Sequence, residues 1–534
     1  MSLFNFTNAF KSAVLFGSLF FLLSCDQKSV STATVPSTTL SSTATLQNEP
    51  QLRLPRLVRG VYTDVVISPE QLQNEEQASF LRDIAEGLVM YDPQGNIQPA
   101  VAESWHTEDN KTWIFTLREQ AKWSNGSPVT AMDFVQSWRQ LATSSSPLKN
   151  YLAFLNMQNA TAVLAGKTAV EELGVQANSP RELQITLDKA TPYLPEMLAH
   201  AALLPQYFAL SEEKHQSEPL QNEPKSEPQI VSNGAYYVKS QQGDRIHLAL
   251  NPYYWQKETV FFPEVDYQKI RTTQPLDGIN LVLNPQQKNL PVQYLPKLCT
   301  YYYEFNFNDP MLEKSAVRKS LIFLASARNL VRGEQSSHLA TNHFLPQSMW
   351  DEQETAWSPI LVEQLLQQNG ITERSPLVLR LTFDQEGFNQ IIGQRLVQMW
   401  SQSDLIHIQP DPVSRQTLLA KRAKGDFQII RSGWCADYNE PSAFLMNFYS
   451  KSPDNKSGYH NEKVDALLEQ SLQPISKEKR TALYQQISQL LQQDNVVLPV
   501  FQYTTPIYLA PNIQGVDKQN PTNVIYSKDL RQSN

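Results

Sequence analysis

The most constraining feature of this chain is the segment 431–441, RSGWCADYNEP, which directly follows a short apolar run at 427–430. The apolar run predicts a strand. The residues after it leave backbone groups free and hold one acid, Asp437, at the tip of that strand. A free strand backbone beside a carboxylate suits binding of the amino end of a peptide.

Length and composition bound the fold and exclude one class of partner. The 534 residues predict two or three domains, and 41% apolar residues suffice for large cores. Scarce glycine (18) and plentiful proline (34) favour a loop-rich α/β protein over a coiled coil or a helical bundle. The net charge of −8 argues against a nucleic-acid partner, which would need a basic face.

The N-terminal residues indicate a targeting segment. Lys11 is the one charged side chain before an apolar run at 13–23, which is short for a membrane span. The sequence LLSC at 22–25 resembles a bacterial lipobox, so we expect a signal peptide over 1–24 and lipidation of Cys25. An ordinary signal peptide cut nearby is the alternative. The polar stretch 25–55 predicts a flexible tether.

The two remaining cysteines are expected to pair. With Cys25 lipidated, Cys299 and Cys435 are left, and an exported protein meets an oxidising compartment. Two buried free thiols are the alternative. No CxxC spacing is present, so the sequence supports neither a redox motif nor a zinc site, and we expect no metal or other cofactor.

Periodicity and capping signals outline the folded part. Thr130 and Asp133 resemble a capping box that starts a helix, and Ser476 predicts the start of another helix over 477–493. The Glu-Pro-rich stretch 211–229 predicts a surface insertion. A further helix is expected over 79–90, and strands are expected at 54–66, 96–99, 112–117, 122–128 and 496–503.

Nine segments together resemble family 5 of the solute-binding proteins of ABC importers, the peptide/nickel clan, and closely its periplasmic oligopeptide-binding, OppA-like branch. The last two are specific to that branch, which includes murein-tripeptide binders. The segments are 85–88, 101–105, 113–118, 121–131, 133–135, 233–236, 251–255, 298–304 and 431–441.

This resemblance implies an α/β protein with the two-lobed periplasmic-binding-protein fold, of the three-domain class II (cluster C) type, with a hinge and a ligand cleft. It also implies a disulfide between Cys299 and Cys435 in neighbouring strands at the cleft. The expected domains are I (56–85, 206–298 and 504–534), II (86–205) and III (299–503).

The resemblance implies that Asp437 binds the α-ammonium group of a peptide. An N-cap or Asx turn before a helix at Ala443 is the alternative. Gly433, Trp434 and Cys435 would add their backbone to an extended peptide. Trp434 would also wall a side-chain pocket, or else pack in the core.

Two arginines match site arginines of the family. Arg422 would bind a ligand carboxylate, because a planar guanidinium suits a bidentate pair. The second is Arg431. Either arginine could instead be solvated or bridge the lobes.

Four pocket positions depart from the family pattern. Gln73 replaces an acid, Leu148 a tyrosine, Asn389 a histidine and Arg415 a tryptophan. The helical and loop sequence expected between about 272 and 295 is also shorter than the family pattern. We therefore expect the amine-binding end to be retained while the pocket walls and the carboxylate end differ. Arg415 suggests an acidic ligand group, and a surface position is the alternative.

The sequence thus predicts a lipid-anchored, monomeric receptor on the periplasmic side of the bacterial envelope. It would bind short peptides and deliver them to the membrane subunits of an ABC permease, without catalysis. Asp26, beside the lipidated cysteine, suggests the inner membrane. A murein-tripeptide receptor and a sensor or chaperone on the same fold are alternatives. An exported hydrolase is another, but HExxH, GxSxG and Gly-rich phosphate motifs are absent from the sequence.

Overall fold

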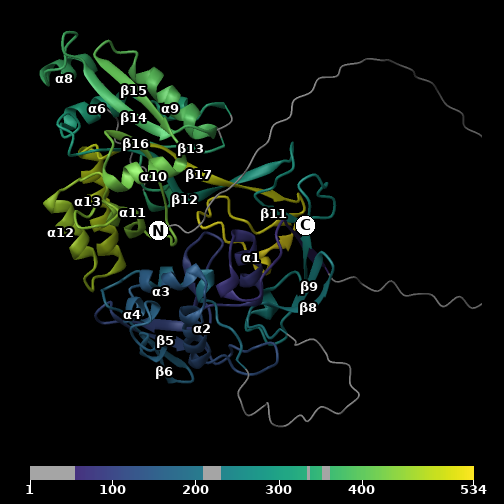
Figure 1. Cartoon of the computed structure of the whole chain (residues 1–534). Helices are drawn as coiled ribbons and strands as arrows, with labels where there is room; N and C mark the ends of the chain where they lie inside the picture. Colours follow the sequence, from purple (N-terminus) through teal and green to yellow (C-terminus); the bar gives the residue numbers. More distant parts are fainter. Residues whose placement is uncertain (1–54, 209–229, 334–336, 351–360, 534) are drawn as a thin grey trace, which may run out of the picture. The chain divides into compact units, whose positions relative to one another are not determined.

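The computed structural model describes residues 55–208, 230–333, 337–350 and 361–533 (Figure 1). The expected signal peptide, Cys25 and nearly all of the expected tether lie outside these residues, as does the insertion at 211–229. Within the described ranges, none of the helices has the length and apolar character needed to span a membrane.

The largest sheet among the described residues has eleven strands in the order β15-β14-β16-β12-β17-β11-β1-β10-β9-β8, with β13 paired to β17. Its first members in the chain are β1 (Arg56–Val61), β8 (Tyr236–Gln242), β9 (Arg245–Leu250), β10 (Glu264–Lys269) and β11 (Leu281–Leu283). The others are β12 (Val292–Phe305), β13 (Leu339–Ala340), β14 (Leu377–Asp384), β15 (Ile406–Val413), β16 (Ile429–Cys435) and β17 (Val497–Leu509).

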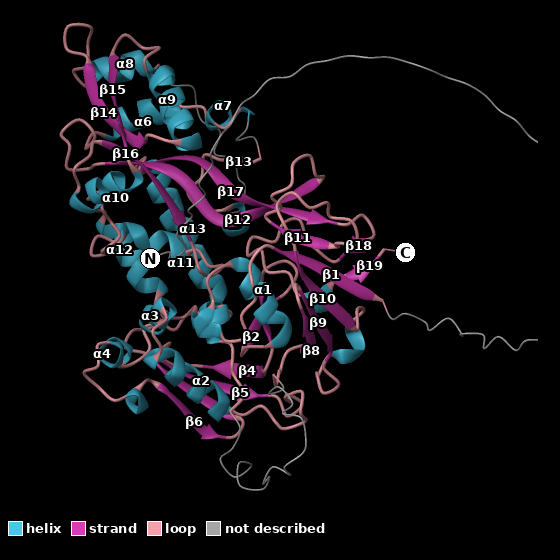
Figure 2. Cartoon of the chain, turned by 45° about the vertical axis from the view of Figure 1, so that its right-hand side comes forward, coloured by secondary structure: helices cyan, strands magenta, loops and turns pink. Residues whose placement is uncertain are grey.

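The long strands β12 and β17 connect the two groups of strands in this sheet (Figure 2). They pair antiparallel, and their register shifts between Pro296 and Thr300, where three residues of β12 oppose one of β17. Such a bulge locally disrupts the ladder of hydrogen bonds. The expected domain boundaries at 298/299 and 503/504 fall at this bulge.

A separate four-stranded sheet, β4-β5-β7-β6, carries helices α2 to α4. The helix α2 starts at a capping box, because the Asp133 carboxylate accepts from both the backbone N (2.7 Å) and the Oγ1 (3.0 Å) of Thr130. The elements of this part are β4 (Ala102–His106), β5 (Thr112–Leu117), β6 (Val175–Ser179), β7 (Glu182–Thr186), α2 (Ala131–Thr143), α3 (Asn150–Phe154), α4 (Ala160–Leu164) and α5 (Leu194–Leu198).

The β14-β16-β12 end of the large sheet is buried on both faces. Tyr301 and Tyr303 of β12 enter one core with Leu379 and Ile392, whereas Tyr302 enters another with Phe444 and Ile487. Helices cover both faces: α6 (Ser315–Leu324), α7 (Ala327–Leu330), α8 (Val362–Gln368), α9 (Gly387–Trp400), α10 (Arg415–Lys424), α11 (Ser442–Leu445), α12 (Glu462–Ser471) and α13 (Lys477–Gln493).

Three of the family-like segments contact one another around Glu86. Its buried carboxylate accepts from Tyr254 Oη (2.6 Å) and Trp255 Nε1 (2.8 Å). Asn233 accepts from Glu86 N and donates to Glu86 O. A Cβ on Gly234 would lie 2.6 Å from Ala85 N, so the close approach there requires glycine. These segments therefore hold the fold together.

Several local predictions are confirmed, and others are wrong. Ser476 caps α13, which has the predicted bounds 477–493. The predicted helix 79–90 is displaced, because Asn74 caps α1 (Glu75–Ile84) and the apolar run Val89–Tyr91 forms β2, paired with β3 (Ile97–Pro99). The segment predicted as a strand at 122–128 is a turn closed by one isolated bridge. The strand expected at 496–503 continues to Leu509, and a short pair, β18 (Ile513–Gln514) and β19 (Arg531–Gln532), follows.

Candidate functional site

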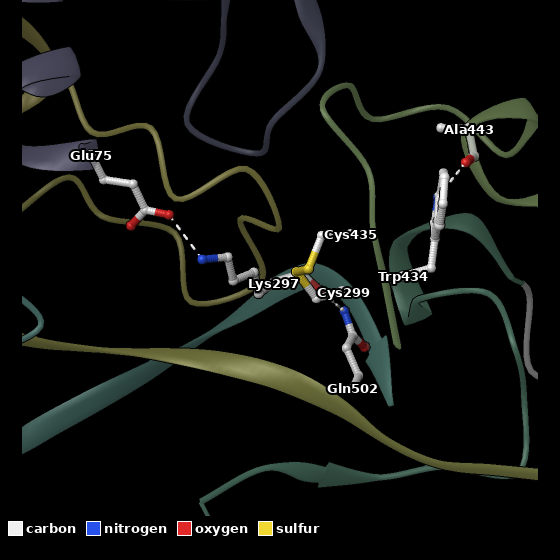
Figure 3. Close-up of a disulfide and its surroundings, with 7 residues drawn as sticks. All are labelled: Glu75, Lys297, Cys299, Trp434, Cys435, Ala443 and Gln502. Carbon is white, nitrogen blue, oxygen red and sulfur yellow. Dashed lines mark hydrogen bonds and ion pairs between the residues drawn. A yellow bond between two sulfur atoms is a disulfide. The ribbon is translucent and has the colours of Figure 1, made fainter. Parts of the chain in front are cut away.

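The segment that opens the sequence argument forms β16 and the loop after it. Gly433, Trp434 and Cys435 lie inside β16, not beyond its end as the apolar run at 427–430 suggested. Cys435 pairs in register with Cys299 of β12, and the two form a disulfide (Figure 3). The predicted pairing is therefore confirmed. Near the disulfide, Gln502 Nε2 donates to Lys297 O across the bulge at 2.9 Å.

One edge of β16 lacks a partner strand over its last five residues. On one side, β12 pairs with β16 along its whole length. On the other side, β14 pairs only at Ile429 and Ile430. From residue 431 to 435, no described strand lies on that edge. Such an edge presents N–H and C=O groups in the pattern that an added strand completes.

Asp437 stands two residues beyond this open edge. Its side chain is half-buried, and it has no hydrogen bond or ion pair within the described ranges. Burial raises the pKa of Asp437 above its ordinary value, because the charged form loses hydration. The helix near residue 443 is α11, whose N-cap is Pro441, so Asp437 does not cap it. Among the described residues, the carboxylate thus has no structural partner.

An aromatic cluster lies beside Asp437. The ring of its buried neighbour Tyr438 stacks on Tyr193 at 5.3 Å and contacts Phe154 at 6.3 Å between centroids. Tyr151 in turn contacts Phe154 and stacks on His200 at 4.1 Å. The rings that contact Tyr438, next to Asp437 in the chain, therefore come from α3 and from the segments that flank α5.

Arg422 and Arg431 bind separate carboxylates on opposite faces of the sheet. Arg431 Nη2 and Nε lie 2.5 and 2.7 Å from Asp384 Oδ2, and its side chain is buried beside Tyr301. Arg422 Nη2 and Nε lie 2.7 and 2.9 Å from Glu304 Oε1. Glu304 pairs in register with Ile430, the neighbour of Arg431, so the two ion pairs lie on alternate faces. The two arginines do not form one cluster.

Trp434 is half-buried against the core around Tyr302, and its Nε1 donates to Ala443 O at 2.6 Å (Figure 3). Gly433 and Cys435, the residues beside it on β16, are exposed. The tryptophan therefore anchors the loop that carries Asp437, while its two neighbours remain accessible along the open edge.

The four departing positions are scattered. Gln73 is exposed before α1, and Leu148 is buried in the core beside α2. Asn389 lies near the start of α9, with a buried Oδ1 that has no hydrogen-bond partner. Arg415 begins α10, is 60% exposed, and lies 3.7 Å from Asp384 Oδ1. Arg415 thus contacts Asp384, the carboxylate that also pairs with Arg431.

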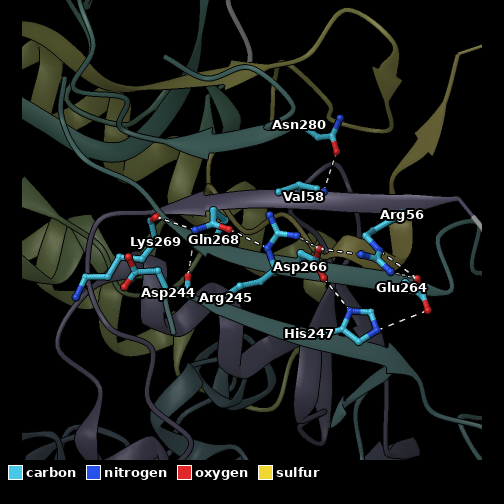
Figure 4. A network of polar contacts seen from close by, with 10 residues as sticks. All are labelled: Arg56, Val58, Asp244, Arg245, His247, Glu264, Asp266, Gln268, Lys269 and Asn280. Atoms are coloured by element: carbon cyan, nitrogen blue, oxygen red, sulfur yellow. Dashed lines mark hydrogen bonds and ion pairs between the residues drawn. The ribbon is translucent and has the colours of Figure 1, made fainter. Parts of the chain in front are cut away.

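Elsewhere in the large sheet, charged residues satisfy one another. Across β1, β10 and β9, Asp266 binds Arg56 (3.3 Å), Arg245 (3.4 Å) and His247 (2.7 Å), and Arg56 also binds Glu264 (Figure 4). This dense cluster is internally compensated. Asp437 differs, because no hydrogen bond or ion pair from the described residues reaches its carboxylate.

Sequence reasoning missed the aromatic residues clustered around Tyr438. Tyr151, Tyr193 and His200 stand outside the matched segments, and each is buried or half-buried by tertiary contacts. Nothing in their local sequence distinguishes them from core aromatics. Sequence reasoning also missed the buried acid Glu440, whose Oε2 accepts a hydrogen bond from Ser442 N at 2.8 Å.

Known proteins resemble this chain in sequence and in fold. The family model described as bacterial extracellular solute-binding proteins, family 5 Middle, matches residues 96–456. A putative binding protein of Haemophilus influenzae is 50% identical over 97% of each chain. The periplasmic oligopeptide-binding protein OppA of Salmonella typhimurium is 30% identical, over 89% of this chain and 92% of its own. A solved structure of MppA, a periplasmic murein tripeptide binding protein in an unliganded open form, matches with a TM-score of 0.80 at 28% identity, covering 90% of this chain and 98% of that one. The expected α/β fold is confirmed.

Proposed function

Because the chain belongs to family 5 of the bacterial extracellular solute-binding proteins, we propose that it captures short peptides by their amino end and backbone and delivers them to an ABC permease for import. The observation that carries this proposal is the half-buried carboxylate of Asp437, which has no partner among the described residues and stands at the end of an open strand edge. A carboxylate in that position suits an ammonium group, and the edge suits the main chain behind it.

The proposed binding rests on the attraction between the half-buried carboxylate of Asp437 and the ammonium group of a peptide. At about 3 Å and an effective dielectric constant of roughly 20, a carboxylate and an ammonium attract by about 5 kcal/mol before desolvation is subtracted. Hydrogen bonds to charged groups retain roughly 1.5–3 kcal/mol in net terms. The open edge from 431 to 435 adds main-chain bonds that do not depend on side chains, so varied peptides fit.

The proposal includes a cellular setting. The protein works without catalysis or a cofactor, as a monomer on the periplasmic side of the bacterial envelope, held by lipid on Cys25. Its partners are the membrane subunits of the permease. The names of the periplasmic relatives support this setting, as does the LLSC sequence at 22–25.

A murein tripeptide is the second candidate ligand. The similarity to the solved murein tripeptide binding protein favours it, together with the altered pocket positions Asn389 and Arg415. Mass spectrometry of small molecules released from the purified protein separates the two candidates. A mixture of ordinary peptides supports the general receptor, whereas one peptide containing diaminopimelate supports the specialised one.

The test of the amine-binding role is calorimetric titration with trialanine and N-acetyltrialanine. We expect the wild type to bind free trialanine at least tenfold more tightly, about 1.4 kcal/mol. Asp437→Asn should abolish that preference, because the amide carries no charge to attract the ammonium group. Asp404→Asn, the same change at an exposed position, is the matched control. Equal binding of the two peptides by the wild type would remove Asp437 from this role.

A further inference from the structure

Side chains hold the bulge of β12 in place of regular strand pairing. Between Pro296 and Thr300, three residues of β12 oppose one of β17, so the ladder of hydrogen bonds is interrupted. The side chain of buried Gln502 spans this gap: its Nε2 donates to Lys297 O at 2.9 Å, and its Oε1 accepts from Gln347 N at 3.2 Å. The main chain of the bulge is therefore fixed from the β17 side.

The residues before Asp437 are attached to the same bulge. Ala436 N donates to Leu298 O at 2.8 Å, and the next bulge residue, Cys299, forms the disulfide with Cys435 (Figure 3). Cys435 and Ala436 are the two residues that immediately precede Asp437. A shift of the bulge would therefore carry the main chain at Asp437 with it.

Lys297 connects this bulge to helix α1. Its Nζ lies 2.8 Å from Oε1 of Glu75, the first residue of α1, and Figure 3 shows Lys297 beside the disulfide. The helix itself is fixed on β10, because Phe80 packs edge-on against Tyr267 at 5.0 Å and the Tyr267 hydroxyl donates to Asp83 Oδ2 at 2.7 Å. Glu75 thus gives the bulge a fixed point outside β12, β16 and β17.

We propose that the Glu75–Lys297 ion pair is a positioning contact for peptide binding: it holds the bulge of β12, and through the bulge it holds Asp437 where the carboxylate meets the ligand's ammonium group. This inference rests on the proposed function and adds to it the residues that place the carboxylate. In this role neither Glu75 nor Lys297 touches the ligand.

The exposure of the pair limits the size of the effect. The side chains of Lys297 and Glu75 are 25% and 40% exposed, so water partly solvates both charges. Such pairs contribute little to folding, and the change that one passes to another site cannot exceed its own coupling free energy. For a partly exposed pair, that limit corresponds to about fivefold in affinity.

A direct action of the two charges on the ligand is the alternative, and it predicts different signs. If Lys297 acted directly on the ammonium group, it would repel the ligand, so its removal would strengthen binding. If Lys297 positions Asp437, its removal weakens binding. Exchanging the two charges separates the roles further, because the exchange preserves the ion pair while it reverses any direct effect on the ligand.

The experiment is calorimetric titration of trialanine and N-acetyltrialanine, with the ratio of the two dissociation constants as the readout. We expect Glu75→Gln and Lys297→Met each to reduce the wild-type preference for the free amine by about two- to fivefold. Glu75→Lys combined with Lys297→Glu should restore most of the preference, and Lys297→Arg should keep it, since both retain an ion pair at the bulge. Thermal melting of each variant should stay close to that of the wild type.

Glu103→Gln is the matched control. It breaks an ion pair of similar length and exposure, because Glu103 is 41% exposed and lies 3.0 Å from Arg181, in the separate four-stranded sheet. We expect it to leave the preference for the free amine unchanged. An equal loss in Glu103→Gln would overturn the positioning role, because the loss would then follow from any broken surface pair.

The remaining outcomes separate this inference from the proposed function. If the wild type prefers the free amine and neither Glu75→Gln nor Lys297→Met changes that preference, the positioning role falls and the amine-binding proposal stands. A stronger preference in Lys297→Met, or loss of the preference in Lys297→Arg, also overturns the positioning role. If the wild type binds both peptides equally, both proposals fall.

Discussion

Glu440 gives the sharpest prediction about stability. It lies three residues after Asp437 and is 7% exposed, with Arg480 Nε 3.6 Å from its Oε1. Burial, and then the nearby charge of Glu196, raises the pKa of Glu440 from 4.5 to about 7, although Ser442 and Arg480 oppose the rise. The folded protein therefore holds this proton more tightly than the unfolded chain does.

The size of the effect follows from that difference. Each pKa unit corresponds to 1.36 kcal/mol, so a rise from 4.5 to about 7 is about 3 kcal/mol. Because the raised value belongs to an acid, the protonated form stabilises the folded state fully below pH 4.5. That stability is lost as pH rises from 4.5 to 7. Glu440→Gln keeps the neutral hydrogen-bonding shape at every pH and removes the cost of a buried charge.

The assay is urea unfolding of the wild type and Glu440→Gln between pH 4.5 and 8. We expect nearly equal free energies of unfolding at pH 4.5 and a gain of up to about 3 kcal/mol for the variant at pH 8. Glu373→Gln, at an exposed position, should show no such trend. The reasoning is refuted if the difference between Glu440→Gln and the wild type does not change with pH, or if the variant is the less stable protein at pH 8.

Two further predictions concern the strands around the site. Replacing both Cys299 and Cys435 with serine should lower the free energy of unfolding by at most about 5 kcal/mol, because the bridge closes a loop across a separation of 136 residues; melting with and without reductant measures this, and unchanged melting of the reduced wild type would contradict it. Asp384→Asn should cost about 3–5 kcal/mol by leaving buried Arg431 uncompensated, and Asp384→Leu with Arg431→Met should recover most of it. Urea unfolding tests this, and a double variant no more stable than Asp384→Asn would count against a purely structural pair.

Capping residues and apolar periodicity correctly predicted helices whose starts are set by residues adjacent in the sequence. Ser476 and the apolar stripe after it fixed α13, and the Thr130–Asp133 pair fixed the start of α2. The helix expected over 79–90 failed because the periodic pattern runs on into Val89–Tyr91, whose burial in β2 is decided by a partner strand. A short apolar run does not carry that information itself.

The residues of the candidate site also fall into two groups, those found from local sequence and those brought in by tertiary packing. Asp437, the open edge of β16 and the disulfide belong to two continuous segments, so matching motifs located them together. Tyr151, Tyr193 and His200 join the cluster around Tyr438 through ring contacts between segments far apart in the sequence. Their positions are products of tertiary packing, and no spacing in the sequence encodes them.

The arginines show that a motif match does not reveal the partners a side chain has in the fold. Arg422 and Arg431 match the family pattern, yet each carries its own carboxylate within 3 Å, and they stand on opposite faces of one sheet. Recruiting either one to a ligand requires the ligand to displace or share a buried partner, which costs more than binding an uncompensated charge. Asp437 imposes no such exchange, since no hydrogen bond or ion pair from the described residues reaches its carboxylate. An ammonium group bound at Asp437 would therefore displace no buried partner among the described residues.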